Sequence, residues 1–175
     1  MTHLPFVRDA LERYEGRLLL YARRLLGDEE RARDVVQETF LKLCRQRRAD
    51  VERRLAEWLY TVVRNGAIDA RRRERVMKVS DEVRVDERVD PAGGGPGARL
   101  EREEEGARVL ASLAALPEKE QEALRLKFQG GLSYREIAGV TGESIGTVGW
   151  RIHEGLKTLR ARLGARETSE GRVTS

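Results

Sequence analysis

The chain has 175 residues, of which 37% are charged and only 5% aromatic, and its formal net charge is +4. This length allows one ordinary domain or two small ones, and the composition suits helices with long solvated faces better than a sheet-rich core. The charge is uneven, with net values of +6 over residues 1–78, −5 over 79–106 and +3 over 107–175. Basic domains suit a polyanionic partner, because neutralised phosphates release counterions, although solvated helix faces alone produce the same pattern.

The sequence has no pattern that indicates a disulfide, a metal site or a membrane span. Its single cysteine, Cys44, cannot form an internal disulfide, and no cluster of ligand residues suggests a metal site. Because Cys44 lies beside Phe40, Leu41 and Leu43, we expect a thiol packed in the core. No apolar run approaches the ~18 residues of a membrane span, and the N-terminus lacks a signal-peptide pattern. We therefore expect a cytoplasmic protein.

Residues 4–78 show helical periodicity throughout. A first stripe ends at Gly27, after which Asp28 can cap a second helix. A polar break at residues 47–50 separates that helix from a third, and a fourth short segment, 67–73, ends in basic residues. The stripes are Leu4, Val7, Leu11, Tyr14, Leu18, Tyr21 and Leu25, then Ala32, Val35, Val36, Thr39, Phe40 and Leu43, then Leu55, Trp58, Leu59, Val62 and Val63.

Residues 79–106 differ in composition from the chain on either side. The stretch 81–90 is acidic with scattered valines, and 91–97 contains two prolines and four glycines, which sustain neither a helix nor a strand. A flexible acidic linker is predicted, with a short strand at 83–89 as the alternative. Residues 101–105 are rich in glutamate, which suits the start of the next helix.

Residues 107–163 have the pattern of a helix-turn-helix domain, and the polar residues 164–175 of a disordered tail. Pro117 suits the start of a helix that ends at Gly130 and Gly131. Ser133 and Glu136 have the spacing of a capping box, a glycine-containing turn follows at 140–143, and Ser144 can cap a longer helix. The fold class predicted is therefore all-α, with two small helical domains joined by a linker.

The second helix of this motif would enter the major groove of DNA. Its apolar side comprises Ile145, Val148, Ile152, Leu156, Leu159 and Leu163, and the opposite side presents Gly146, Thr147, Trp150, His153, Glu154 and Lys157, with Arg151 at the flank. Arg151 and Lys157 can pair with phosphates, and Thr147 and His153 can meet bases or backbone. Trp150 is unusual on an outward face, where it would contact DNA or a partner protein.

Three segments together resemble the sigma-70 family of bacterial RNA polymerase sigma factors. Residues 34–43 (DVVQETFLKL) are similar to its polymerase-binding helix, 58–73 to its promoter-melting segment, and 116–148 to its −35-reading domain. Their order and separation match the two-domain, extracytoplasmic-function (ECF) subgroup. The resemblance implies a sigma factor that binds core RNA polymerase, opens the −10 element and contacts the −35 element. It implies neither a cofactor nor enzymatic activity.

The resemblance also assigns roles to residues. Asp34, Gln37, Glu38 and Leu41 would bind the clamp helices of the β′ subunit, and the second domain would meet the flap of the β subunit. Asn65 would face a flipped −10 base, with Arg64, Arg71, Arg72, Arg73 and Arg75 on phosphates. Ser133, Tyr134, Arg135, Thr147, Trp150, Arg151, His153 and Lys157 would contact the −35 element. An anti-sigma factor is a usual partner in the family.

The recognition helix departs from the family pattern, and this leaves other functions open. Gly149, Trp150, Glu154 and Gly155 stand where the family commonly has more basic residues, so the reading of an ordinary −35 element is in question. A stand-alone helix-turn-helix regulator would explain 107–163 but leave 34–43 and 58–73 unused. A polymerase-interaction module with weak DNA reading is the other alternative. An enzyme is least favoured, because His3 and His153 lie in different domains without a catalytic constellation.

Overall fold

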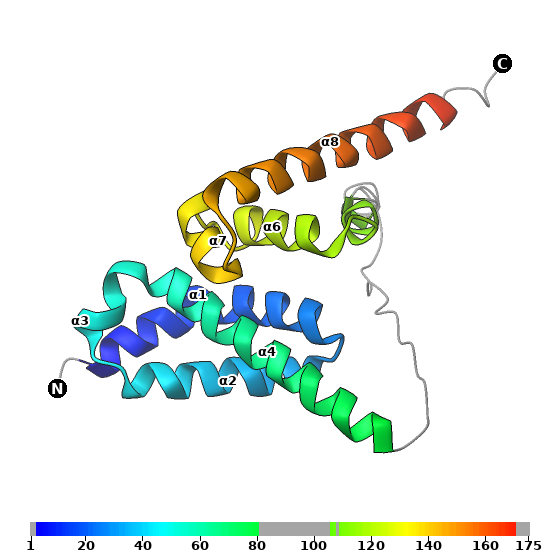
Figure 1. Ribbon diagram of the computed structural model, residues 1–175. Coiled ribbons are helices and arrows are strands. Elements are labelled where there is room, and N and C mark those ends of the chain that lie inside the picture. The colour runs from blue at the N-terminus through cyan, green and yellow to red at the C-terminus, as the bar shows by residue number, and fades with distance from the viewer. Residues whose placement is uncertain (1–2, 81–105, 108, 171–175) are drawn as a thin grey trace, which may run out of the picture.

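The computed structural model describes residues 3–80, 106–107 and 109–170, which are helical and contain no strand (Figure 1). The helices are α1 (His3–Leu26), α2 (Glu29–Arg45), α3 (Arg48–Val51), the 3₁₀ turn η1 (Glu52–Arg54), α4 (Leu55–Ser80), α6 (Glu118–Phe128), α7 (Tyr134–Thr141) and α8 (Ile145–Glu170). The all-α prediction is confirmed. The strand considered at 83–89 and the helix start expected at 101–105 lie outside the described residues.

The N-terminal domain is a bundle in which α1, α2 and α4 pack on one another (Figure 1). The turn between α1 and α2 has the predicted chemistry: Gly27 has φ +72°, and the Asp28 carboxylate accepts a hydrogen bond of 2.7 Å from the Arg31 amide. The predicted stripe of α1 is only partly buried, since Leu4 is 81% exposed. The core residues include Tyr14, Leu18, Val36, Phe40, Leu43, Leu59 and Val63.

The third and fourth predicted segments form one continuous helix, α4, which crosses the bundle and projects beyond it (Figure 1). Asn65 and Gly66 are therefore inside a helix. A glycine costs a helix about 1 kcal/mol relative to alanine. Here it lets α4 approach α2 closely, because a Cβ at Gly66 would lie 3.1 Å from Cγ1 of Val35. Packing against α2 thus offsets the local cost of the glycine.

The prediction of a buried thiol at Cys44 is wrong, because the side chain is exposed. Phe40 and Leu43 are the core residues of this part of α2, and Leu43 has no exposed surface. Cys44 follows Leu43 by about 100° around the helix, which turns it away from the core. The neighbouring Leu41 is also exposed, at 48%, for the same reason.

The C-terminal domain contains α6, α7, α8 and a helical stretch at 109–114. Pro117 precedes α6, and the chain turns at Gly130 and Gly131, as predicted. Helix α8 continues to Glu170, beyond the end predicted at residue 163, and extends away from the rest of the molecule (Figure 1). The core residues of this domain include Leu124, Leu126, Leu132, Ile137, Val140, Val148 and Ile152.

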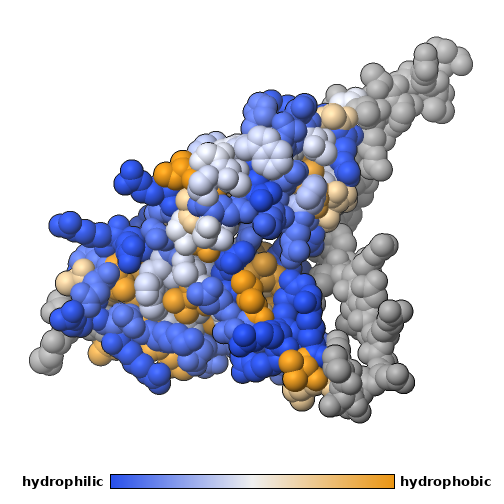
Figure 2. Space-filling model, in the orientation of Figure 1, coloured by the Kyte–Doolittle hydropathy of each residue, from blue (hydrophilic) through white to orange (hydrophobic). Residues whose placement is uncertain are grey.

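The two domains are in contact, and their buried residues form one cluster. Helix α7 packs against α4, and Gly139 makes this approach close, since a Cβ there would lie 2.7 Å from Cδ of Glu57. The surface is mainly hydrophilic, with hydrophobic side chains gathered along α4 (Figure 2). Among the described residues, no helix has the length and apolarity needed to cross a membrane.

Candidate functional site

The four residues predicted to bind polymerase form a solvent-exposed ridge along α2. Asp34, Gln37, Glu38 and Leu41 are all exposed. They are spaced three and four residues apart, so they share one side of the helix. Among the described residues, the only ion pair that these four side chains make is between Glu38 and Lys42, at 3.9 Å, so the fold uses little of this ridge. We call these four residues the α2 ridge.

A groove lies on each side of the α2 ridge. The larger, of about 860 Å³, runs between α2 and α4, and Asp34 and Glu38 line it. The smaller, of about 420 Å³, runs between α1 and α2, and Gln37 and Leu41 line it beside Cys44. A ridge with a groove on either side can enter a concave partner surface while each groove receives a partner side chain. The structure therefore brings the predicted residues together in a shape suited to protein binding.

The six residues predicted to hold the −10 element lie on three different sides of α4. Asn65, Arg72 and Arg75 are exposed, and Asn65 has no side-chain hydrogen bond within the described residues. Arg73 is exposed as well and lines the larger groove. Arg64 and Arg71 face the C-terminal domain. Thus the structure does not gather all six into one binding surface.

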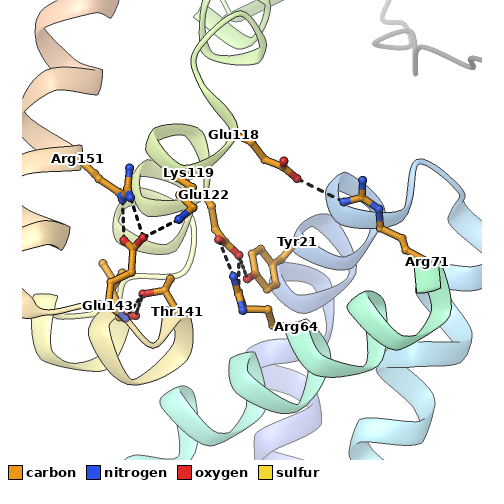
Figure 3. Close-up of polar contacts among 10 residues, drawn as sticks. Tyr21, Arg64, Arg71, Glu118, Lys119, Glu122, Thr141, Glu143 and Arg151 are labelled. Atoms are coloured by element: carbon orange, nitrogen blue, oxygen red, sulfur yellow. Dashed lines mark hydrogen bonds and ion pairs between the residues drawn. The ribbon is translucent and has the colours of Figure 1, made fainter.

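Arg64 meets a glutamate that the sequence analysis did not single out. Glu122, on α6, accepts hydrogen bonds from Nε of Arg64 at 2.9 Å and from the Tyr21 hydroxyl at 2.7 Å (Figure 3). The hydrogen bond to Glu122 raises the pKa of Arg64, and burial raises the pKa of Tyr21. Tyr21 and Glu122 are 101 positions apart in the chain. No local sequence pattern predicts contacts between residues so far apart in the chain.

The helix-turn-helix has the caps that the sequence predicts. The Ser133 hydroxyl accepts from the Glu136 amide at 3.3 Å, and the Glu136 carboxylate accepts from the Ser133 amide at 2.7 Å. Gly142 has φ +74° at the end of α7, and the Ser144 hydroxyl accepts from the Thr147 amide at 3.1 Å. Ser133 is thereby occupied in capping α7. The two residues that follow it, Tyr134 and Arg135, are exposed.

The outward face of α8 is only partly as predicted, because Thr147 is half-buried with its hydroxyl 2.8 Å from that of Ser144, and Ile145, expected on the apolar side, is 49% exposed. Trp150 is 56% exposed, and His153 and Lys157 are also exposed. Arg151 instead makes a bidentate ion pair with Glu143, with contacts of 2.6 and 2.8 Å (Figure 3). These hydrogen bonds hold the pKa of Glu143 below its ordinary value. Arg151 therefore joins the turn to the recognition helix, and its guanidinium lies 5.8 Å from the Trp150 ring centroid.

The two unusual glycines of α8 have different surroundings. A Cβ at Gly149 would lie 3.7 Å from the Tyr134 ring, which is ordinary contact. A Cβ at Gly155 would lie 2.8 Å from Cδ1 of Leu124, which is too close. Gly155 therefore lets α8 approach α6.

Among the described residues, no group of His, Cys, Asp or Glu side chains could hold a metal ion.

Comparisons with known proteins agree with this arrangement. Residues 10–76 match the family model described as Sigma-70 region 2, and residues 107–159 match Sigma-70, region 4. The chain is 32% identical to the ECF RNA polymerase sigma factor SigL of Mycobacterium tuberculosis, over 90% of this chain and 88% of SigL. It is 30% identical to SigE of Mycolicibacterium smegmatis, over 95% of this chain and 65% of SigE.

Two solved structures have similar folds. The sigma factor RpoE of Bartonella quintana, in complex with the anti-sigma factor NepR, has a TM-score of 0.65 and 26% identity, covering 90% of this chain and 96% of RpoE. CnrH, in complex with the cytosolic domain of CnrY, has a TM-score of 0.61 and 26% identity, covering 94% of this chain and 91% of CnrH. The chain therefore belongs to the sigma-70 family and is an ECF sigma factor, the class of protein that directs RNA polymerase to promoters.

Proposed function

We propose that this sigma factor divides its task among three surfaces: the α2 ridge for core polymerase, the exposed side of α4 for the −10 element, and the outward face of α7 and α8 for the −35 element. The observation that carries the proposal is the α2 ridge, whose four side chains are exposed and nearly unused by the fold. The protein acts by binding, without catalysis of its own, and it works in the cytoplasm, where polymerase meets the promoter.

The α2 ridge would dock on the clamp helices of the β′ subunit. It combines two carboxylates and an amide with an exposed leucine, so a basic partner surface would gain charge complementarity as well as apolar contact. The adjoining α2–α4 groove adds apolar surface from Val35, Val62 and Met77. A helix laid across the ridge would bury that surface while its cations met Asp34 and Glu38. The flap of the β subunit would bind the C-terminal domain.

Asn65 would read an unpaired −10 base. Its carboxamide carries donors and an acceptor that can match the edge of a base, and it makes no competing side-chain bond within the described residues. Arg72 and Arg75 are exposed farther along α4 and would hold the phosphates of the same strand. Base reading of this kind requires the base to leave the duplex stack.

The C-terminal domain would contact upstream DNA with few positively charged side chains. Trp150, His153 and Lys157 point outward from α8, and Arg135 is exposed at the start of α7. The ion pair with Glu143 reduces the contribution of Arg151 to phosphate binding. Fewer neutralised phosphates give a weaker salt dependence. The Trp150 ring would then supply apolar contact with sugars or thymine methyl groups.

The similarity to RpoE and CnrH also supports a protein regulator. RpoE was solved with the anti-sigma factor NepR, and CnrH with the cytosolic domain of CnrY. A regulator of the same kind would suit this chain, although its residues do not identify one. The α2 ridge is a surface that such a regulator would compete for.

The test is transcription initiation with purified protein and core RNA polymerase on fragmented genomic DNA, followed by mapping of the transcript starts. We expect specific starts, and we expect Glu38→Arg to weaken polymerase binding at least tenfold without unfolding the protein. Glu12→Arg is the matched control, because Glu12 is an exposed acid on α1, outside the α2 ridge. Sequence-specific DNA binding without polymerase binding would overturn the proposal in favour of a stand-alone regulator.

A further inference from the structure

Arg125, on α6, is a buried arginine whose charge no carboxylate neutralises among the described residues. Only 9% of the residue is exposed, and its two hydrogen bonds reach uncharged amides of the same helix, Gln121 at 3.4 Å and Gln129 at 3.5 Å. Its buried Nε has no hydrogen-bond partner in the described part of the chain. Burial lowers the pKa of Arg125 to about 10, which still leaves the guanidinium charged at pH 7. Because an uncompensated buried charge is destabilising, an anion that reached this group would bind favourably.

The acids of the two helices that meet here lie elsewhere. On α6, Glu118 and Glu122 are paired with arginines of α4, and Glu120 lies beside Gly155 of α8. The acids of α1 lie at positions 9–15, away from the end of α1 that contacts this part of α6. Neither helix therefore supplies a counter-charge for Arg125.

A second arginine reaches the same place from α1. Nε of Arg24 donates to the side-chain oxygen of Gln121 at 2.8 Å, and this is the oxygen that also accepts from Arg125. The amide nitrogen of Gln121 donates to the Ala114 carbonyl at 3.2 Å, which keeps the oxygen turned toward the two arginines. Two guanidinium groups thus converge on one uncharged acceptor. Arg24 is exposed, so the pair is open to solvent on the side of α1.

The face of α1 that meets α6 carries further positive charge. Arg17, Tyr21 and Arg24 are spaced four and three residues apart, so they share this face. The Tyr21 hydroxyl makes its hydrogen bond to α6 (Figure 3), and Nη1 of Arg17 lies 3.7 Å from the position that a Cβ of Gly131 would take. The groups that α1 turns toward Arg125 are therefore cations and a hydroxyl.

We infer that Arg24 and Arg125, held together by Gln121, form a binding site for a phosphate group at the contact between α1 and α6. Phosphate oxygens would accept from both guanidinium groups, where one amide oxygen does so now. A phosphate group carries about 1.5 to 2 negative charges at pH 7, which matches the two arginines, whereas one carboxylate would neutralise only one of them. The inference goes beyond the proposed function, since none of these three residues belongs to the surfaces proposed for polymerase or DNA.

Titration of the full-length protein with inorganic phosphate at constant ionic strength tests the site. Nitrogen-15 NMR detects the Nε–H groups of arginines, and the signals of Arg24 and Arg125 are assigned by their loss in Arg24→Met and Arg125→Met. We expect both signals of the wild type to shift and to saturate with a dissociation constant on the order of 1 mM. Each variant should bind phosphate about tenfold more weakly, as measured by the signal of the arginine that remains.

Stability in urea gives a second readout. Without phosphate, Arg125→Met should unfold at a higher urea concentration than the wild type, because the unpaired buried charge is gone. Phosphate should raise the unfolding midpoint of the wild type but not that of the variant. Arg53→Met is the matched control, because Arg53 is an exposed arginine of η1 without an ion pair among the described residues, and it should respond to phosphate like the wild type. Should Arg125→Met not fold, Arg24→Met still tests the site, since Arg24 is exposed.

Two further ligands define the chemistry. Acetate should bind about tenfold more weakly than phosphate, because it carries a single charge. Adenosine monophosphate identifies the source of the phosphate group: tighter binding than phosphate indicates a phosphate monoester, and equal or weaker binding indicates the free ion.

The inference would be overturned by arginine signals that phosphate does not move, by equal binding of acetate, or by an Arg24→Met variant that binds phosphate like the wild type. None of these measurements involves polymerase or promoter DNA. Loss of the phosphate site would therefore leave the proposed function standing, and failure to start transcription would leave the phosphate site standing.

Discussion

The ion pair between Glu143 and Arg151 yields a quantitative prediction for the helix-turn-helix. The side chains of Glu143 and Arg151 are 19% and 17% exposed, and the guanidinium meets the carboxylate in two contacts of 2.6 and 2.8 Å. The ammonium group of Lys119 also lies 3.5 Å from this carboxylate. Coulombic attraction at about 4 Å amounts to roughly 4 kcal/mol at an effective dielectric of 20, and desolvation offsets much of it. Glu143→Gln should therefore lower the free energy of unfolding by about 1–2 kcal/mol at pH 7.

The pH dependence of this loss identifies its cause. Arg151 holds the pKa of Glu143 below the ordinary value of 4.5 in the folded protein. A depressed pKa contributes stability that is fully present above pH 4.5 and is lost as the pH falls through the folded pKa. The stability difference between wild type and Glu143→Gln should thus be constant near neutral pH and shrink below pH 4.5, because the protonated glutamate resembles glutamine.

Urea unfolding followed by circular dichroism, repeated across this pH range, measures the difference. Glu154→Gln is the control, since the pair between Glu154 and Lys157 is 3.6 Å apart and its side chains are 32% and 69% exposed. Exposed pairs of this kind contribute well under 1 kcal/mol. A Glu143→Gln variant as stable as wild type, or a stability loss that persists unchanged at pH 3, would refute the reasoning.

Three further predictions concern packing and exposure. Gly155→Ala should lower the free energy of unfolding by about 1–3 kcal/mol in urea titrations, because its Cβ would lie 2.8 Å from Leu124; unchanged stability would mean that α8 can shift freely. Tyr60→Phe should be neutral or stabilising by up to about 1 kcal/mol in the same assay, because its buried hydroxyl has no hydrogen-bond partner among the described residues. Cys44 is exposed, so a thiol reagent should modify the native protein at a rate close to that of the urea-unfolded chain, and strong protection would contradict its position.

The helix-turn-helix could be predicted in detail because its signals are local. The Ser133 capping box, the turn glycine Gly142 and the Ser144 cap each act within four residues, and the structure has all three. The outward position of Trp150 followed from helical periodicity in the same way. Sequence patterns were less informative at the edges of the core: apolar neighbours suggested that Cys44 is buried, and periodicity placed Leu4 on a buried stripe, but both side chains are exposed.

The contacts that the sequence did not reveal are long-range. The sequence indicated two segments, 55–63 and 67–73, whereas the structure has the single helix α4, in which Gly66 lies close to Val35. In the sequence, nothing distinguishes Glu122 from the other acids of α6. Its hydrogen bonds with Tyr21 and Arg64 arise from the way the domains pack. Such pairings depend on how the domains meet, and no spacing within one helix encodes them.

Residues of α4 that are close in the sequence have different surroundings. Successive residues of a helix are about 100° apart, so Asn65 is exposed while the neighbouring Arg64 is bound to Glu122. The α2–α4 groove opens on another side, lined by Val62 and Gly66. Asn65, proposed to read a base, and the α2 ridge are therefore both accessible in this structure, whereas Arg64 and Arg71 are paired with Glu122 and Glu118 of α6.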